Sequence, residues 1–120
     1  MRVSVTKCFG FEAAHHLPRY EGACNRLHGH SYKMQVTVSG SVDEITGMIM
    51  DFTVLKSIVK EKVVDKYDHR NLNDFFTNPT AENMVIHIFR ELSEAFTNLG
   101  LTVESVKLWE TESSFAECRR

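Results

Sequence analysis

The sequence predicts an α+β domain in which two helices cover one face of a four-stranded antiparallel sheet. Four segments have the apolar patterning of strands, and two others repeat apolar residues at helical spacing. Their order is strand, strand, helix, helix, strand, strand, which is typical of this fold class. Because the chain has 120 residues with no linker or repeat, a single domain over 1–120 is expected.

The first two strands are expected over 3–15 and 28–40. In the second, apolar residues from Tyr32 to Val38 alternate with polar ones, which is the pattern of a strand with one buried face. The segment between the strands contains Pro18 and Gly22 and is expected to be a loop.

Two helices follow, each expected to begin at a threonine N-cap, Thr53 or Thr80. The polar stretch 68–79 separates them, and Gly100 is placed to end the second helical region. Strands are then expected over 101–110 and 115–119, joined by a turn near 112–114. Four strands with two covering helices leave sheet edges that an oligomer can close.

Composition disfavours nucleic-acid-binding, membrane-spanning and secreted proteins. Fourteen basic and sixteen acidic residues give a formal charge of −2, without the basic excess of a nucleic-acid binder. No apolar run approaches the roughly 20 residues that cross a bilayer, and the first residues do not resemble a signal peptide. Cys8, Cys24 and Cys118 form no CxxC pair, so a reducing cytoplasm is expected. Cys8 and Cys118 lie in strands and are expected to be small packed side chains.

Two histidines, His28 and His30, begin the second strand and project to the same side because they are two residues apart. His15 ends the first strand, and antiparallel pairing would bring it beside them. Three neutral imidazoles would bind Zn²⁺ and leave one coordination position open, as in a catalytic site. The alternative is a chance motif with its rings bound to backbone or solvent. His16 would replace His15 if the strand contained a bulge.

Cys24 lies in the polar loop, four residues before His28. A nearby Zn²⁺ would favour its thiolate, so that Cys24 can act as a base or nucleophile. The alternative is a fourth ligand that closes a structural Cys-His₃ site, and the loop allows both.

An acid–histidine pair and a strand carboxylate complete the set of candidate residues. Asp68 can orient His69 for acid–base work if the pair lies in an irregular segment; otherwise the two belong to a polar helix end. Glu110 is in phase with Val106 and Leu108, which places a carboxylate on an apolar strand face. Such a carboxylate can bind a ligand with adjacent N–H donors, or else reach solvent at the strand end.

These residues occur in a set of motifs that resembles the 6-pyruvoyltetrahydropterin synthase superfamily from end to end. The motifs are Phe11-Glu12-Ala13-Ala14-His15, Cys24-Asn25-Arg26-Leu27-His28-Gly29-His30, Asp68-His69-Arg70-Asn71-Leu72-Asn73, Asn78-Pro79-Thr80-Ala81-Glu82-Asn83 and Glu110-Thr111. The resemblance implies a tunnelling fold (T-fold), in which trimers join their sheets into a barrel and two trimers stack as a hexamer. It also implies active sites between subunits.

The resemblance further implies a role for each candidate residue. His15, His28 and His30 would bind zinc, Cys24 would be the general base, Asp68 and His69 would relay its proton, and Glu110 would anchor the pterin ring. The substrate implied is 7,8-dihydroneopterin triphosphate. Members that carry Glu in place of Cys24 form a subgroup to which this chain does not belong.

Two activities of the superfamily share these residues. One eliminates triphosphate to give 6-pyruvoyltetrahydropterin; the other also cleaves the side chain, releasing acetaldehyde and giving 6-carboxy-5,6,7,8-tetrahydropterin for queuosine and other deazapurines. The short chain, with its compact loop between His15 and Cys24, more closely resembles the members with the second activity. The residues that hold the triphosphate stay open among Arg19, Arg26 and Lys33.

Two other classes of function compete with this interpretation. One is a non-catalytic module with a structural zinc closed by Cys24. The other is an iron-dependent oxygenase with two histidines and a carboxylate, which the absence of a suitably spaced acid beside His28 and His30 disfavours.

Overall fold

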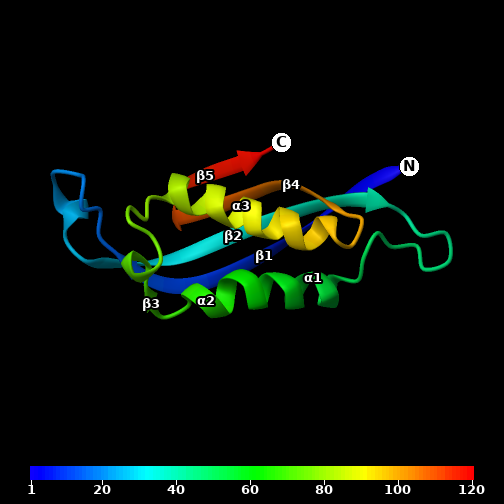
Figure 1. The fold of residues 1–120 in the computed structure, drawn as a ribbon, viewed down its shortest axis with the longest axis horizontal. Helices are drawn as coiled ribbons and strands as arrows, with labels where there is room; N and C mark the ends of the chain where they lie inside the picture. Colours follow the sequence, from blue (N-terminus) through cyan, green and yellow to red (C-terminus); the bar gives the residue numbers. More distant parts are fainter.

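The computed structural model describes residues 1–120 and contains a five-stranded sheet in the order β3-β1-β2-β4-β5 (Figure 1). The four longer strands are antiparallel neighbours and confirm the four predicted ones: β1 (Arg2–His15), β2 (His28–Ser41), β4 (Thr102–Thr111) and β5 (Ser114–Arg119). The fifth, β3 (Arg70–Asn71), pairs parallel with β1. The prediction of a purely antiparallel four-stranded sheet was therefore wrong in this detail.

The short strand β3 has a local origin that no hydrophobic pattern reveals. It pairs with Ala13 and Ala14 of β1 through only two residues. On its N-terminal side, the backbone N–H of His69 donates to the carbonyl of Glu12. Backbone hydrogen bonds alone make this pairing, so polar residues can form it.

The two predicted helical regions are both present. The first consists of α1 (Phe52–Val59), a π-helical stretch (Lys60–Val64) and α2 (Asp65–Tyr67); the second is α3 (Ala81–Thr97). Thr80 caps α3 as predicted, since its side chain accepts a hydrogen bond from Asn83 N. The first cap is Asp51 and not Thr53, because the Asp51 carboxylate accepts from the Thr53 backbone N–H at 2.7 Å.

Both helices pack on the same face of the sheet, where they enclose the core. Alternate residues of β1, β2 and β4, such as Phe11, Met34 and Leu108, meet Val63 and Ile88 of the helices there. The prediction of two helices over one face is therefore confirmed. The opposite face is open, and it carries the exposed Cys8. The expectation that Cys8 is packed was wrong, because its position in β1 is even while the buried residues of that strand are odd.

The β1–β2 hairpin places the end of β1 against the start of β2. Residues pair without interruption from Arg2 with Ser41 to His15 with His28. The loop 16–27 therefore emerges at one end of the molecule, beside the ends of both strands (Figure 1). None of the helices combines the length and apolar character needed to span a bilayer.

Candidate metal centre and its surroundings

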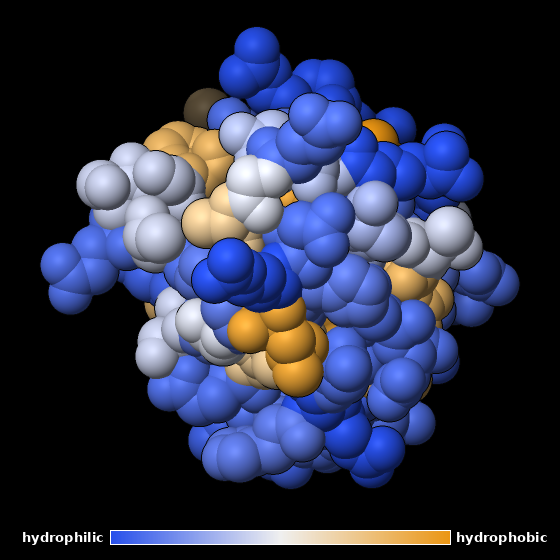
Figure 2. Space-filling model, turned by 90° about the vertical axis from the view of Figure 1, so that its left-hand side faces the viewer, coloured by the Kyte–Doolittle hydropathy of each residue, from blue (hydrophilic) through white to orange (hydrophobic).

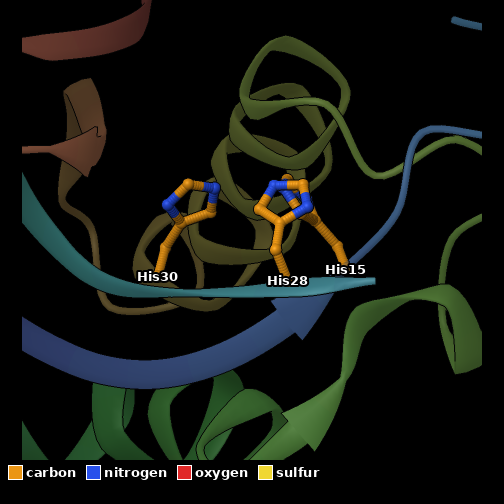
Figure 3. Close-up of side chains that lie close together, drawn as sticks. All are labelled: His15, His28 and His30. Carbon is orange, nitrogen blue, oxygen red and sulfur yellow. The ribbon is translucent and has the colours of Figure 1, made fainter. Parts of the chain in front are cut away.

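The strand register brings three imidazole rings together on the helix-covered face. His15 pairs directly with His28, and His30 pairs with Ala13, two residues before His15. One ring nitrogen from each histidine lies within 4.8 Å of the others (Figure 3). The structure therefore gathers His15, His28 and His30, as the sequence predicted, and His16 is not in the group.

Backbone carbonyls determine which nitrogen of two rings carries the proton. His15 Nδ1 lies 2.8 Å from the carbonyl oxygen of Pro79, and His28 Nδ1 lies 2.6 Å from that of Arg26. A carbonyl oxygen only accepts, so both Nδ1 atoms donate and both neutral rings keep a lone pair on Nε2. Hydrogen bonds of this kind orient the histidine ligands of metals.

The two Nε2 atoms face each other at 3.1 Å. Two lone pairs at this distance repel unless a cation or a proton lies between them. Two imidazole nitrogens on one tetrahedral zinc ion are separated by about 3.3 Å. The geometry of this chain thus fits a metal ion bound by the three rings.

The third ring, His30, completes the group. Its Nε2 is buried without a hydrogen-bond partner, and its nearest charged neighbour is Glu110 Oε1 at 3.7 Å. Burial lowers the pKa of His15 and of His30, which keeps both rings neutral, as metal ligands must be. Three neutral nitrogen donors suit zinc better than magnesium or calcium, which prefer oxygen.

The N-terminus of α3 holds the carbonyl that orients His15. Thr80 caps the helix, and the side-chain amide of Asn83 donates to the carbonyl of Asn78 at 2.9 Å. These two bonds fix the backbone on both sides of Pro79, which is buried. The Pro79 contact was missed from the sequence because a carbonyl has no residue-type signal.

Tyr32 was also missed, although its position offered a signal. It follows His30 by two residues on the same buried face of β2, and its hydroxyl lies 3.2 Å from His15 Nδ1. Burial raises the pKa of Tyr32, so its hydroxyl stays protonated.

Cys24 lies in a 3₁₀ turn (Ala23–Asn25) within the loop and is half-buried. Its carbonyl accepts from the backbone N–H of Leu17 at 2.8 Å, which draws the turn towards the end of β1. Its thiol is not among the clustered ligand atoms, which come from the three histidines. The geometry therefore favours an open three-histidine site over one closed by a thiolate.

Asp68 and His69 lie in the irregular segment after α2, as predicted. Asp68 Oδ1 lies 3.1 Å from His69 Nδ1 and accepts from the backbone N–H of Glu12 at 2.9 Å. The Glu12 amide is the main reason that the pKa of Asp68 lies below its usual range. His69 has a positive φ of 59°, and its side chain is 78% exposed. Within one chain, neither side chain forms a hydrogen bond or ion pair with the three histidines or with Glu110.

Two hollows flank these groups. One, of about 580 Å³, is lined by residues that include His30, His69 and Glu12, and the other, of about 440 Å³, by Glu110 and the start of α3. Figure 2 views the molecule from the end that carries loop 16–27, and this end is mostly hydrophilic with separate apolar spots.

Comparison with known proteins places the whole chain in one group. A family model described as 6-pyruvoyl tetrahydropterin synthase matches residues 4–120. A 6-carboxy-5,6,7,8-tetrahydropterin synthase of Synechocystis is 43% identical over 93% of this chain and 89% of that protein. An Archaeoglobus fulgidus protein that is provisionally named for the same activity is 46% identical over 92% of this chain and 90% of that protein.

The fold comparison agrees. The structure of Caenorhabditis elegans 6-pyruvoyl tetrahydropterin synthase superposes with a TM-score of 0.88 at 31% identity, covering 100% of this chain and 96% of the other. The α+β architecture with two helices on one sheet face is therefore shared with that enzyme.

Proposed function

Since the chain belongs to the 6-pyruvoyl tetrahydropterin synthase family, we propose that it is a zinc-dependent lyase acting on 7,8-dihydroneopterin triphosphate. The products are 6-carboxy-5,6,7,8-tetrahydropterin, acetaldehyde and triphosphate, and the pathway is that of queuosine and other 7-deazapurines. The observation that carries this proposal is the pair of Nε2 atoms held 3.1 Å apart beside a third imidazole, in two rings whose Nδ1 atoms donate to backbone carbonyls. The names of the Synechocystis and Haemophilus influenzae relatives support the choice of product.

His15, His28 and His30 would hold the zinc. Bound there, Zn²⁺ would act as a Lewis acid on the side-chain hydroxyls of the substrate and acidify the neighbouring C–H. The protein's own contribution is to orient the rings and, through burial, to lower the pKa of His15 and His30 so that these two stay neutral. The carbonyls of Pro79 and Arg26 orient His15 and His28.

Cys24 is the proposed general base. In this role its thiolate takes the proton from the substrate side chain, and triphosphate leaves. The half-burial of Cys24 supports this role, because its carbonyl bonds to Leu17, just beyond the end of β1, while its thiol is not part of the histidine cluster. A non-catalytic zinc module would instead need Cys24 as its fourth ligand.

Glu110 is the proposed anchor for the pterin ring. It stands 3.7 Å from His30 Nε2 and lines the hollow next to α3. A carboxylate in this position can accept two hydrogen bonds from adjacent N–H groups of a planar heterocycle. The ring would thus lie beside the metal, with its side chain directed at the zinc.

Asp68 and His69 would relay the proton of Cys24, and we infer that they serve the site of a neighbouring subunit. Within one chain the two side chains bond to each other, Asp68 also accepts from the Glu12 backbone N–H, and neither side chain bonds to the three histidines. The outer edge of β1 is paired only at 13–14, and β5 is the other edge strand. Edge pairing between copies would bring such groups together. The proposed assembly is a homohexamer made of two trimers.

The proposal places the enzyme in the cytoplasm, where its three free cysteines stay reduced. It assigns no role to nucleic acid or to a membrane.

A second candidate is the sister activity, which yields the 6-pyruvoyl product without side-chain cleavage. A relative from Dictyostelium discoideum named 6-pyruvoyl tetrahydrobiopterin synthase is 41% identical over 82% of this chain and 74% of its own. Both candidates use the same residues, so the distinction lies in the product.

Mass-spectrometric product analysis tests the proposal. Zinc-loaded protein incubated with 7,8-dihydroneopterin triphosphate should give 6-carboxytetrahydropterin and acetaldehyde in equal amounts. A 6-pyruvoyl product without acetaldehyde would select the sister activity. Absence of turnover with both zinc and substrate present would refute the lyase assignment.

A further inference from the structure

The side-chain amide of Asn73 forms two hydrogen bonds with the backbone of His16, the first residue after β1. Asn73 Oδ1 accepts from the His16 backbone N–H at 2.9 Å, and Asn73 Nδ2 donates to the His16 carbonyl at 3.0 Å. Both partners are peptide groups with fixed roles, so the orientation of the amide is unambiguous. Asn73 thus contacts His16 as a neighbouring strand would.

This contact extends the pairing of β3 with β1. Arg70 and Asn71 pair with Ala13 and Ala14, and the chain then turns away into a 3₁₀ helix (Leu72–Asp74). Two positions after Ala14, at the first residue beyond β1, the Asn73 side chain takes the place of a backbone partner for His16. The end of β1 is therefore held on both edges, by β2 and by the segment that follows Asp68 and His69.

The Asn73 amide is itself fixed by its own turn. The Asn71 side chain accepts from the Asn73 backbone N–H at 3.0 Å, which caps the 3₁₀ helix. Leu72, between them, is fully buried in the core. A side chain with this support has little rotational freedom to lose, which makes its two hydrogen bonds effective as a restraint.

His16 connects the metal ligand His15 to the part of the loop that bonds to Cys24. It directly follows the metal ligand His15, and it precedes Leu17, whose backbone N–H donates to the carbonyl of Cys24 at 2.8 Å. The restraint on His16 therefore continues through Leu17 to the turn that carries the thiol. Beyond that bond, the loop is held mainly by its own short-range contacts, such as Asn25 Nδ2 to the Tyr20 carbonyl.

We propose that Asn73 is a positioning residue that fixes the base of loop 16–27 and thereby sets the place of the Cys24 thiol relative to the three-histidine site. This role rests on the proposed function, in which Cys24 moves a proton of the substrate. Two of the zinc ligands have supports that do not involve Asn73: His15 at Pro79, and His28 at Arg26 near the far end of the loop. Loss of the Asn73 contact should therefore displace the thiol and leave the metal bound.

The test uses two variants and one matched control. Asn73→Asp keeps the acceptor for His16 N–H but replaces the donor with a carboxylate facing a carbonyl; Asn73→Leu removes both contacts. Thr6→Val is the control, because it removes one exposed side-chain bond from β1 to Thr37, at 2.7 Å, far from the loop. All three are measured as full-length, zinc-loaded protein.

The first measurement is the rate of iodoacetamide alkylation at Cys24, followed by peptide mass spectrometry so that the exposed Cys8 does not interfere. The half-buried thiol should react about tenfold faster in both Asn73 variants, and kcat should fall on the order of 10- to 100-fold while KM and zinc content stay near wild type. Thr6→Val should change none of these. Unchanged alkylation and kcat in Asn73→Asp would overturn the proposal.

A second measurement uses the unaltered protein, so its result does not depend on whether the Asn73 variants fold. In the unaltered protein, the backbone amides of His16 and Leu17 should exchange with solvent as slowly as those amides of β1 that are hydrogen-bonded to β2. Fast exchange at these two amides would overturn the proposal. Alkylation and exchange require no substrate. If wild-type protein showed no turnover, the proposed function would therefore fail while the restraint by Asn73 was still measured.

Discussion

Removing one histidine of the cluster should eliminate the stabilisation that zinc gives to the fold. His28→Ala is the best perturbation, because the ring is only half-buried and its loss creates little cavity, whereas His15 is 1% exposed. The variant leaves two nitrogen ligands and also removes the lone-pair contact at 3.1 Å. Its metal-free form should therefore be no less stable than the metal-free wild type.

The size of the effect follows from ligand linkage. Free zinc at 100 times its dissociation constant stabilises the folded state by about 2.7 kcal/mol. A chain of 120 residues has an unfolding entropy of roughly 0.25 kcal/mol per kelvin, so zinc should raise the unfolding temperature of wild-type protein by about 11 °C. The metal-free protein should still unfold cooperatively, because its core of 20 buried apolar residues does not depend on the site.

Calorimetry with and without a chelator measures both quantities, and His16→Ala serves as the control because His16 adjoins the cluster without joining it. Wild type and control should show the full zinc-dependent shift, and His28→Ala should show almost none. A shift of equal size in His28→Ala would refute the assignment of His28 as a ligand. Equal unfolding temperatures of wild type with zinc and with chelator would refute the site itself.

Three further outcomes are expected. Thr80→Ala should cost about 1 kcal/mol of stability through the lost N-cap of α3, which calorimetry measures. It should also weaken zinc binding about tenfold in a zinc titration, because the carbonyl of the adjacent Pro79 orients His15. Glu110→Gln should keep its zinc but bind the pterin substrate more weakly by about 1.5–3 kcal/mol, which binding assays of a substrate analogue measure; unchanged affinity would contradict the anchor role. The pKa values of His15 and His30 are lowered in the folded chain, so below about pH 6.5 these residues bind more protons in the unfolded chain than in the folded one. Metal-free protein should therefore lose stability as pH falls. Urea unfolding at about pH 7.5 and 5.5 tests this, and equal stability at the two pH values would contradict it.

The secondary-structure elements that were predicted well are those whose residue pattern follows from packing against the core. Alternation in β2 and helical spacing in α3 reflect burial on one face, so both were predictable to within a residue or two. The same alternation, with the hairpin register, placed His15 beside His28 and His30. These inferences use side-chain identity, which the sequence states directly.

The features that escaped prediction depend on backbone groups or on competition between similar residues. The strand β3 forms through peptide hydrogen bonds to Ala13 and Ala14, and no apolar pattern marks it. Asp51 caps the first helix in place of Thr53 because its carboxylate reaches the Thr53 amide and hydroxyl at once. The carbonyl of Pro79 orients a histidine without leaving any trace in residue type.

The central claim is an open three-histidine zinc site with Cys24 as a separate base, and Cys24→Ala tests it most directly. Zinc content by elemental analysis and turnover of 7,8-dihydroneopterin triphosphate would be measured on the same preparation. The account predicts that Cys24→Ala retains its zinc and wild-type unfolding temperature but loses product formation. Loss of zinc together with stability would instead identify Cys24 as a structural ligand, and full turnover with zinc retained would remove it from the mechanism.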